Sequence, residues 1–119
     1  MICISIAEQN VETILSVANS AEMVEIRIDL CHLTEETAAH VFSQLHVPAI
    51  ATCRPQYCDD ATRAILLKTA ISSGAQYVDV EIESDSSFKN VILAFAKEHS
   101  CTSIISYHNY ENTPSREEL

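Results

Sequence analysis

The sequence predicts an α/β fold, and specifically a (β/α)₈ barrel of which this chain supplies roughly the first five strands and four helices. The first observation is an alternation, repeated five times in 119 residues, of short strands rich in β-branched residues with segments that have apolar residues at helical spacing. Such alternation is typical of parallel strands joined by helical crossovers. The second observation is that the predicted strands carry polar and charged residues on one face only.

The predicted elements follow one another without a linker or a second domain. They are strand 2–7, helix 10–20, strand 23–30, helix 35–45, strand 48–54, helix 61–73, strand 77–83, helix 88–96, strand 102–108 and a helix start at 113–119. Thr34 is the predicted N-cap of the second helix. Thr113 is the predicted N-cap of the last helix, and Pro114 is its first helical residue. Gly74, the only glycine, follows the third helix, where a left-handed residue is often needed.

The strand faces favour a barrel over an open sheet. The polar residues that share a face are Glu25, Arg27 and Asp29 in the second strand, Thr52 and Arg54 in the third, Asp79, Glu81 and Glu83 in the fourth, and Ser106 and His108 in the fifth. Open doubly wound sheets have helices on both faces and strands that are apolar throughout. In a barrel, one face points to the axis and can serve a site at the carboxyl ends of the strands. A whole barrel has eight units, so the single domain 1–119 is interpreted as incomplete and its end at Leu119 as a truncation.

Composition argues against several classes of partner. The formal net charge of −10, with seven basic residues, disfavours nucleic acid and anionic membranes, although a few arginines can still bind an anionic small molecule. Five scattered cysteines without a C-x-x-C pair, and the absence of a signal-like N-terminus, indicate reduced thiols in the cytoplasm. Cys31, His32, Cys53 and Cys58 are residue types that can bind zinc, but their spacing matches no common zinc pattern.

Two arginines and a histidine are the candidates for chemistry. Arg27 and Arg54, near the ends of their strands, could clamp a carboxylate or a phosphate, or could instead pair internally with the acidic residues Glu25, Asp79 and Glu81. His108 closes the fifth strand and is suited to proton transfer near neutral pH. The three lysines fall in predicted helices, so a Schiff-base lysine would have to lie outside this chain.

In these residues the chain resembles the type I 3-dehydroquinate dehydratases. The matching segments, in order, are ICIS, EIRIDL, ATCR, YVDVEIE and SYHNYENTPSREEL. The last segment is the most specific, and the resemblance runs along the whole chain.

The resemblance implies a (β/α)₈ barrel that dehydrates 3-dehydroquinate to 3-dehydroshikimate in the shikimate pathway, without metal or cofactor. It implies that His108 is the general acid and base, and that Ser5, Glu25, Arg27 and Arg54 bind substrate. It also implies an imine between substrate and a lysine beyond Leu119, which would leave this chain alone inactive. A small-molecule substrate and a homodimer or other self-association are the expected partners.

The chain departs from the family pattern in one loop, and two other interpretations of its function are open. Where the family often has a glutamate and two glycines after the third-strand arginine, this chain has Cys58, Asp59 and Asp60. The chain could be a non-catalytic half-barrel that self-associates or only binds a ligand. It could also be another Schiff-base barrel of the class I aldolase kind, although such barrels lack the SYHNYENTP string.

Overall fold

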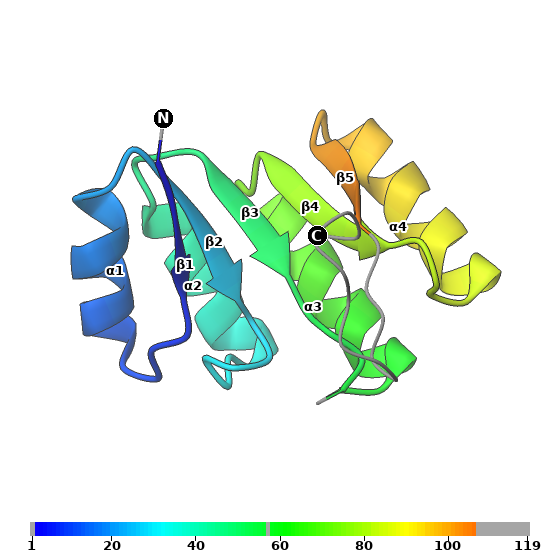
Figure 1. The fold of residues 1–119 in the computed structure, drawn as a ribbon, viewed down its shortest axis with the longest axis horizontal. Helices are drawn as coiled ribbons and strands as arrows, with labels where there is room; N and C mark the ends of the chain where they lie inside the picture. Colours follow the sequence, from blue (N-terminus) through cyan, green and yellow to red (C-terminus); the bar gives the residue numbers. More distant parts are fainter. Residues whose placement is uncertain (1, 57, 107–119) are drawn as a thin grey trace, which may run out of the picture.

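Five strands and four helices alternate along the chain in the computed structural model, which describes residues 2–56 and 58–106 (Figure 1). In order they are β1 (Cys3–Ile6), α1 (Val11–Asn19), β2 (Met23–Arg27), α2 (Glu35–Gln44), β3 (Ala49–Thr52), α3 (Asp60–Ser72), β4 (Tyr77–Glu81), α4 (Ser86–Glu98) and β5 (Thr102–Ser106). The predicted alternation is therefore confirmed for these residues. The predicted helix start at 113–119 and the tip of the fifth strand at His108 lie outside the described residues.

The strands form one parallel sheet in the order β1-β2-β3-β4-β5, so each strand pairs with the one that precedes it in the sequence. The register places Glu25 beside Ser5 on one side and beside Ile50 on the other. It also places Glu81 beside Ser106. Because the register aligns the carboxyl ends of neighbouring strands, polar residues near these ends come within reach of one another.

The four helices cover one face of this sheet, and each helix contacts the next one along the chain (Figure 1). The apolar side chains that alternate with the polar ones in the strands point to the helices. Val24, Ile26, Val78 and Val80 are fully buried there, and they belong to one core with helix residues such as Leu67. A helix layer on one face only agrees with the barrel prediction and differs from a doubly wound sheet.

Every helix begins at a residue whose side chain accepts a hydrogen bond from a backbone N–H of the first turn. These N-caps are Asn10, Thr34, Asp59 and Asp85. The cap predicted at Thr34 is confirmed, and Thr37 completes a capping box with it. Hydrogen bonds from Thr62 hold the pKa of the Asp59 carboxyl below its ordinary value.

Gly74 ends the turn after α3 with a backbone φ of +125°. A Cβ atom at this position would lie 3.3 Å from the carbonyl oxygen of Phe42. Residues other than glycine rarely adopt this backbone conformation, and the close approach of Phe42 in α2 leaves little room for a Cβ atom. The only glycine of the sequence is therefore where the path from α3 to β4 needs it.

The strands are shorter than the sequence pattern suggests, because their ends turn before the pattern stops. After β2, the backbone N–H of Cys31 bonds to the carbonyl of Arg27, and that of His32 bonds to Asp29. Asp29 therefore lies in a turn, although the alternation had placed it in the strand. After β4, the N–H of Ser84 bonds to the carbonyl of Glu81 in the same way.

No helix in the described part of the chain is both long enough and apolar enough to cross a lipid bilayer.

Candidate active site

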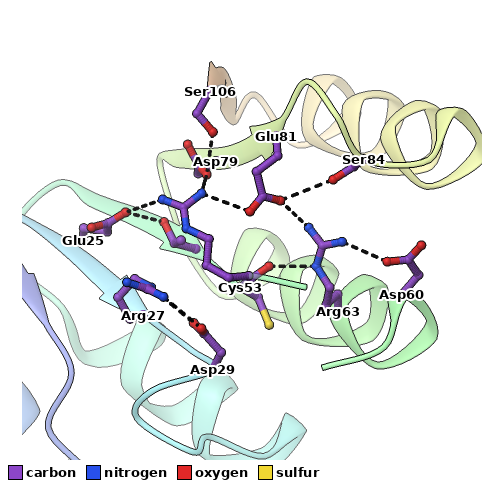
Figure 2. Close-up of polar contacts among 12 residues, drawn as sticks. Glu25, Arg27, Asp29, Cys53, Asp60, Arg63, Asp79, Glu81, Ser84 and Ser106 are labelled. Carbon is purple, nitrogen blue, oxygen red and sulfur yellow. Dashed lines mark hydrogen bonds and ion pairs between the residues drawn. The ribbon is translucent and has the colours of Figure 1, made fainter. Parts of the chain in front are cut away.

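A cluster of ionised side chains lies at the carboxyl ends of the strands, and one of its members reaches it from a helix (Figure 2). Its members come from several strands and from the first turn of α3. They are Glu25 from β2, Arg54 just after β3, Asp79 and Glu81 from β4, and Arg63 from α3. We call these five residues the Arg54 cluster.

Arg54 lies at the centre of the cluster. Its Nη1 atom donates to Asp79 Oδ2 at 2.6 Å and to Glu81 Oε2 at 3.1 Å. Its Nη2 atom lies 3.9 Å from Glu25 Oε2. The side chain of Arg54 is only 12% exposed, so these ion pairs are shielded from water and stronger than surface pairs. Ser106 of β5 also donates to Asp79 Oδ2, at 3.0 Å.

Glu25 connects the cluster to β1 and β3. Its Oε1 atom accepts a hydrogen bond from Ser5 Oγ at 2.9 Å, and its Oε2 atom accepts one from Thr52 Oγ1 at 2.8 Å. Both carboxylate oxygens are therefore held by neighbouring strands. Three of the residues predicted to bind substrate, Ser5, Glu25 and Arg54, come together in this way.

Arg27 has a different environment from the one expected for it. The alternative to substrate binding is that Arg27 and Arg54 pair internally with Glu25, Asp79 and Glu81, and Arg54 does so. Arg27 has another partner. Its Nη2 atom binds Asp29 Oδ2 at 3.0 Å and its Nε atom binds Asp29 Oδ1 at 3.4 Å. Figure 2 shows this pair next to the Arg54 cluster.

Arg63 is a member of the cluster that the sequence patterns did not single out. It lies in the first turn of α3 and its side chain is 1% exposed. Its Nη2 atom donates to Glu81 Oε1 at 2.6 Å, so Arg63 and Arg54 bind opposite oxygens of one carboxylate. A signal was present, because Arg63 precedes the buried Leu66, Leu67 and Ala70 at helical spacing and so lies on the core-facing stripe of α3.

Carboxylates outnumber guanidinium groups in and around the cluster. Three carboxylates of the cluster face two guanidinium groups, Asp60 adds a fourth carboxylate on Arg63, and the pair of Arg27 with Asp29 next to them is neutral. Arg54, Arg63, Asp79 and Glu81 each have an oppositely charged neighbour within hydrogen-bond distance, which ionised groups in a protein interior require. Among the described residues, every buried side-chain nitrogen and oxygen atom has a hydrogen-bond partner. Such a network holds Arg54 in one place before any ligand arrives, which is the preorganisation that a binding site needs.

Three of the free cysteines, Cys31, Cys53 and Cys58, lie near the carboxyl ends of the strands. Burial raises the pKa of the Cys53 thiol, and neighbouring Cys58 raises it further. Burial also raises the pKa of Cys31 to about 11, with a smaller contribution from Asp29. All five cysteines are unpaired. Within residues 2–56 and 58–106, no three His, Cys, Asp or Glu side chains are grouped so that they could hold a metal ion.

Cys58, which departs from the family pattern, lines a cavity of about 340 Å³ beside the Arg27–Asp29 pair. The other residues that line it are Ile28, Asp29, His32, Leu33, Thr62 and Leu66. The cavity is therefore mostly apolar, and it lies between the turn after β2 and the first turns of α3.

The three lysines all lie on helices. Lys68 lies over the ring of Phe95, and Lys89 donates to the carbonyl of Ile82 at 2.7 Å. Lys97 is exposed in the last turn of α4. None of these contacts involves the Arg54 cluster. His108, the predicted proton-transfer residue, lies outside the described residues.

Comparisons with known proteins agree with the resemblance found in the sequence. The family model of type I 3-dehydroquinase matches residues 2–119. The 3-dehydroquinate dehydratase of Methanococcus maripaludis strain C7 is 33% identical over 129 aligned positions, which cover 100% of this chain and 58% of that protein. The enzyme of the same name from Methanocaldococcus jannaschii is 31% identical, with the same coverage. The chain thus spans 58% of the length of these curated relatives.

Solved structures of two enzymes show the same fold. The crystal structure of type I 3-dehydroquinate dehydratase from Clostridium difficile, with covalent modified comenic acid, gives a TM-score of 0.78 at 22% identity, covering 98% of this chain and 53% of that one. The enzyme from Enterococcus faecalis gives 0.77 at 21% identity, covering 98% and 56%. Residues 2–106 are therefore part of a (β/α)-barrel, and the barrel prediction is confirmed. Because the family model matches nearly the whole sequence, the chain belongs to the type I 3-dehydroquinase family.

Proposed function

We propose that the protein is a lyase that removes water from 3-dehydroquinate to form 3-dehydroshikimate in the shikimate pathway. The observation that supports this most directly is that Ser5 of β1, Glu25 of β2 and Arg54, just after β3, meet at the carboxyl ends of the strands. The resemblance assigns all three to substrate binding. Carboxyl ends of strands are where barrel enzymes carry out their chemistry.

In the proposed mechanism, a lysine outside residues 1–119 forms an imine with the C3 ketone of the substrate. The imine withdraws electrons, which makes the neighbouring C2 proton acidic enough for His108 to take. The C–H electron pair becomes the new C1–C2 double bond as the C1 hydroxyl leaves. His108 returns its proton to that hydroxyl, so water is released, and it then assists hydrolysis of the imine. A base with a pKa near neutrality suits both roles.

The cluster would hold the substrate for these steps. A guanidinium group fixed by carboxylates is a rigid donor of charge-assisted hydrogen bonds, and Arg54 would use it for the substrate's polar groups. Arg27 with Glu25 would position the substrate hydroxyls, and Ser5 would contact substrate from β1. The work of these residues is orientation and not proton transfer.

Trapping the imine tests the proposal. The complete gene product, incubated with 3-dehydroquinate and sodium borohydride, should gain the mass of one reduced substrate molecule. Peptide mapping should place the adduct on a lysine other than Lys68, Lys89 and Lys97. We expect the polypeptide 1–119, treated in the same way, to gain no adduct, because none of its lysines lies at the cluster.

Quinate is the matched control, because it has a hydroxyl in place of the ketone and cannot form an imine. A complete gene product that neither traps 3-dehydroquinate nor releases water from it would contradict the proposal. It would favour the alternative of a non-catalytic half-barrel.

Self-association of the polypeptide 1–119 is a further part of the proposal. In the described residues, β1 pairs only with β2 and β5 only with β4, so each presents one side to pairing. Ile2 and Ile4 at β1 are exposed, at 69% and 38%. Apolar edges of this kind associate with other edges. Sedimentation velocity should therefore show dimers or larger species, and a sharp monomer at micromolar concentration would contradict this. For the complete gene product we propose a cytoplasmic homodimer.

A further inference from the structure

Arg63 and Glu81 are the two most deeply buried charged groups of the cluster, yet Arg63 lies on a helix and not on a strand. Its relative exposure is 1%, and it is the largest of the fully buried side chains in the described residues. The next residues on the same stripe of α3 are Leu66, Leu67 and Ala70. Packing alone would favour an apolar residue here too, because replacing buried ion pairs with apolar residues is often neutral or stabilising. An arginine at this position therefore needs another explanation.

The guanidinium group of Arg63 connects three elements. Its Nε atom donates to the backbone carbonyl of Cys53 at 2.8 Å, its Nη1 to Asp60 at 2.9 Å, and its Nη2 to Glu81 at 2.6 Å. The ring of Phe88 in α4 lies 4.1 Å from the guanidinium carbon and covers one face of the group. Only arginine offers a planar fork of donors that can serve several acceptors at once.

Two of these contacts involve the immediate surroundings of Arg54. The carbonyl of Cys53 belongs to the peptide bond that precedes Arg54, so Arg63 fixes the backbone from which that side chain starts. The Glu81 carboxylate receives Arg63 on Oε1 and Arg54 on Oε2, so Arg63 also fixes one of the acceptors that holds the Arg54 guanidinium. Figure 2 shows Arg63 reaching Cys53 and Glu81 from α3. Backbone and side-chain end of Arg54 are thus held by the same group.

We propose that Arg63 is a positioning residue that sets the orientation of Arg54 and, through it, the affinity for the anionic substrate. The inference rests on the proposed function, because it takes Arg54 to contact substrate. Arg63 itself is enclosed by β3, β4 and α4 and acts only through Cys53 and Glu81. Its loss changes where the Arg54 guanidinium points, and this weakens substrate binding more than it slows the chemical steps.

Arg63→Met in the complete gene product tests the inference, because methionine fills similar space without donors or charge. We expect KM for 3-dehydroquinate to rise about tenfold or more, with a smaller change in kcat, since Arg54 would bind the ground state and the transition state alike. Arg63→Lys keeps the charge but offers no planar fork, so its KM should lie between those of the wild type and Arg63→Met. It also supplies the measurement if Arg63→Met does not fold.

Lys68→Met is the matched control, because it removes a cation over an aromatic ring from the same helix, at a place away from Arg54. It should leave KM unchanged. Nitrogen-15 NMR of arginine side chains gives a readout that a purely structural role would not move. The Arg54 Nε–Hε signal, assigned by its loss in Arg54→Lys, should shift in Arg63→Met and not in Lys68→Met.

The outcomes distinguish a failure of the positioning role of Arg63 from a failure of the substrate-binding role of Arg54. If Arg54→Lys raises KM while folded Arg63→Met and Arg63→Lys leave KM and the Arg54 signal unchanged, the positioning role is wrong and the proposed function stands. If Arg54→Lys leaves KM unchanged, the assigned role of Arg54 in substrate binding fails, and the inference built on it fails with it.

Discussion

Glu81→Gln is expected to lower the free energy of unfolding of the complete gene product by about 3–5 kcal/mol, the usual cost of removing one partner from a buried ion pair. The carboxylate of Glu81 is 1% exposed and binds Arg63 at 2.6 Å and Arg54 at 3.1 Å. Glutamine keeps the size of the side chain but removes the charge, so two guanidinium groups lose a counter-ion in a region that water does not reach. Urea denaturation followed by far-UV circular dichroism measures the change.

Glu98→Gln is the matched control, because Glu98 is exposed in the last turn of α4. It should change the free energy of unfolding by less than about 0.5 kcal/mol. The double variant Arg63→Met with Glu81→Met should be less destabilised than the sum of its single changes, since removing both partners leaves fewer unpaired charges. Equal losses for Glu81→Gln and Glu98→Gln would show that the buried ion pairs do not support the fold.

His108→Ala should reduce kcat of the complete gene product by about 10²–10⁴-fold, the range for removing a general acid or base. Formation of the imine should remain possible, because the lysine and the substrate-binding residues are intact. Turnover is measured by the absorbance of the conjugated product, and the imine by borohydride trapping and intact mass. The expected result is therefore a slow enzyme that still traps substrate.

His40→Ala provides the comparison for this variant, because His40 is exposed on α2. Its kcat should be close to that of the wild type. Near-normal turnover in His108→Ala would show that another group moves the proton, and the assignment of His108 would have to be abandoned.

Patterns within short windows were sufficient for the order and type of the elements. Strand and helix periodicity depends on neighbouring residues, and so does capping, which is why Thr34 and Gly74 were placed correctly. The division of each strand into a polar and an apolar face also follows from alternation alone, and it placed Glu25 and Arg54 together. The predicted strands end too far along the chain, because turns such as the one at Asp29 depend on backbone hydrogen bonds that an alternation of residue types does not reveal.

The partners within the site were harder to predict, because they depend on residues far apart in the sequence. Arg63 is buried because Glu81, on the next strand, and Phe88, on the next helix, reach it across the fold. Taken alone, a charged residue in the first turn of a helix predicts exposure. Only its place on the apolar stripe of α3 indicated otherwise. The role of His108 in proton transfer stays a prediction, and so do the roles of Ser5, Glu25, Arg27 and Arg54 in substrate binding.

The strictly sequential strand order has a consequence for synthesis on the ribosome. Because each strand pairs with its predecessor, a nascent chain can add one unit after another to an existing edge without waiting for distant segments. When β3 and α3 have formed but β4 has not, Glu25 and Asp60 are the acidic neighbours of Arg54 and Arg63. The strand that follows carries Asp79 and Glu81, which add the closest ion pairs of both arginines when it docks. The ion pairs of the mature site would thus also guide the growing sheet to accept its fourth strand in the correct register.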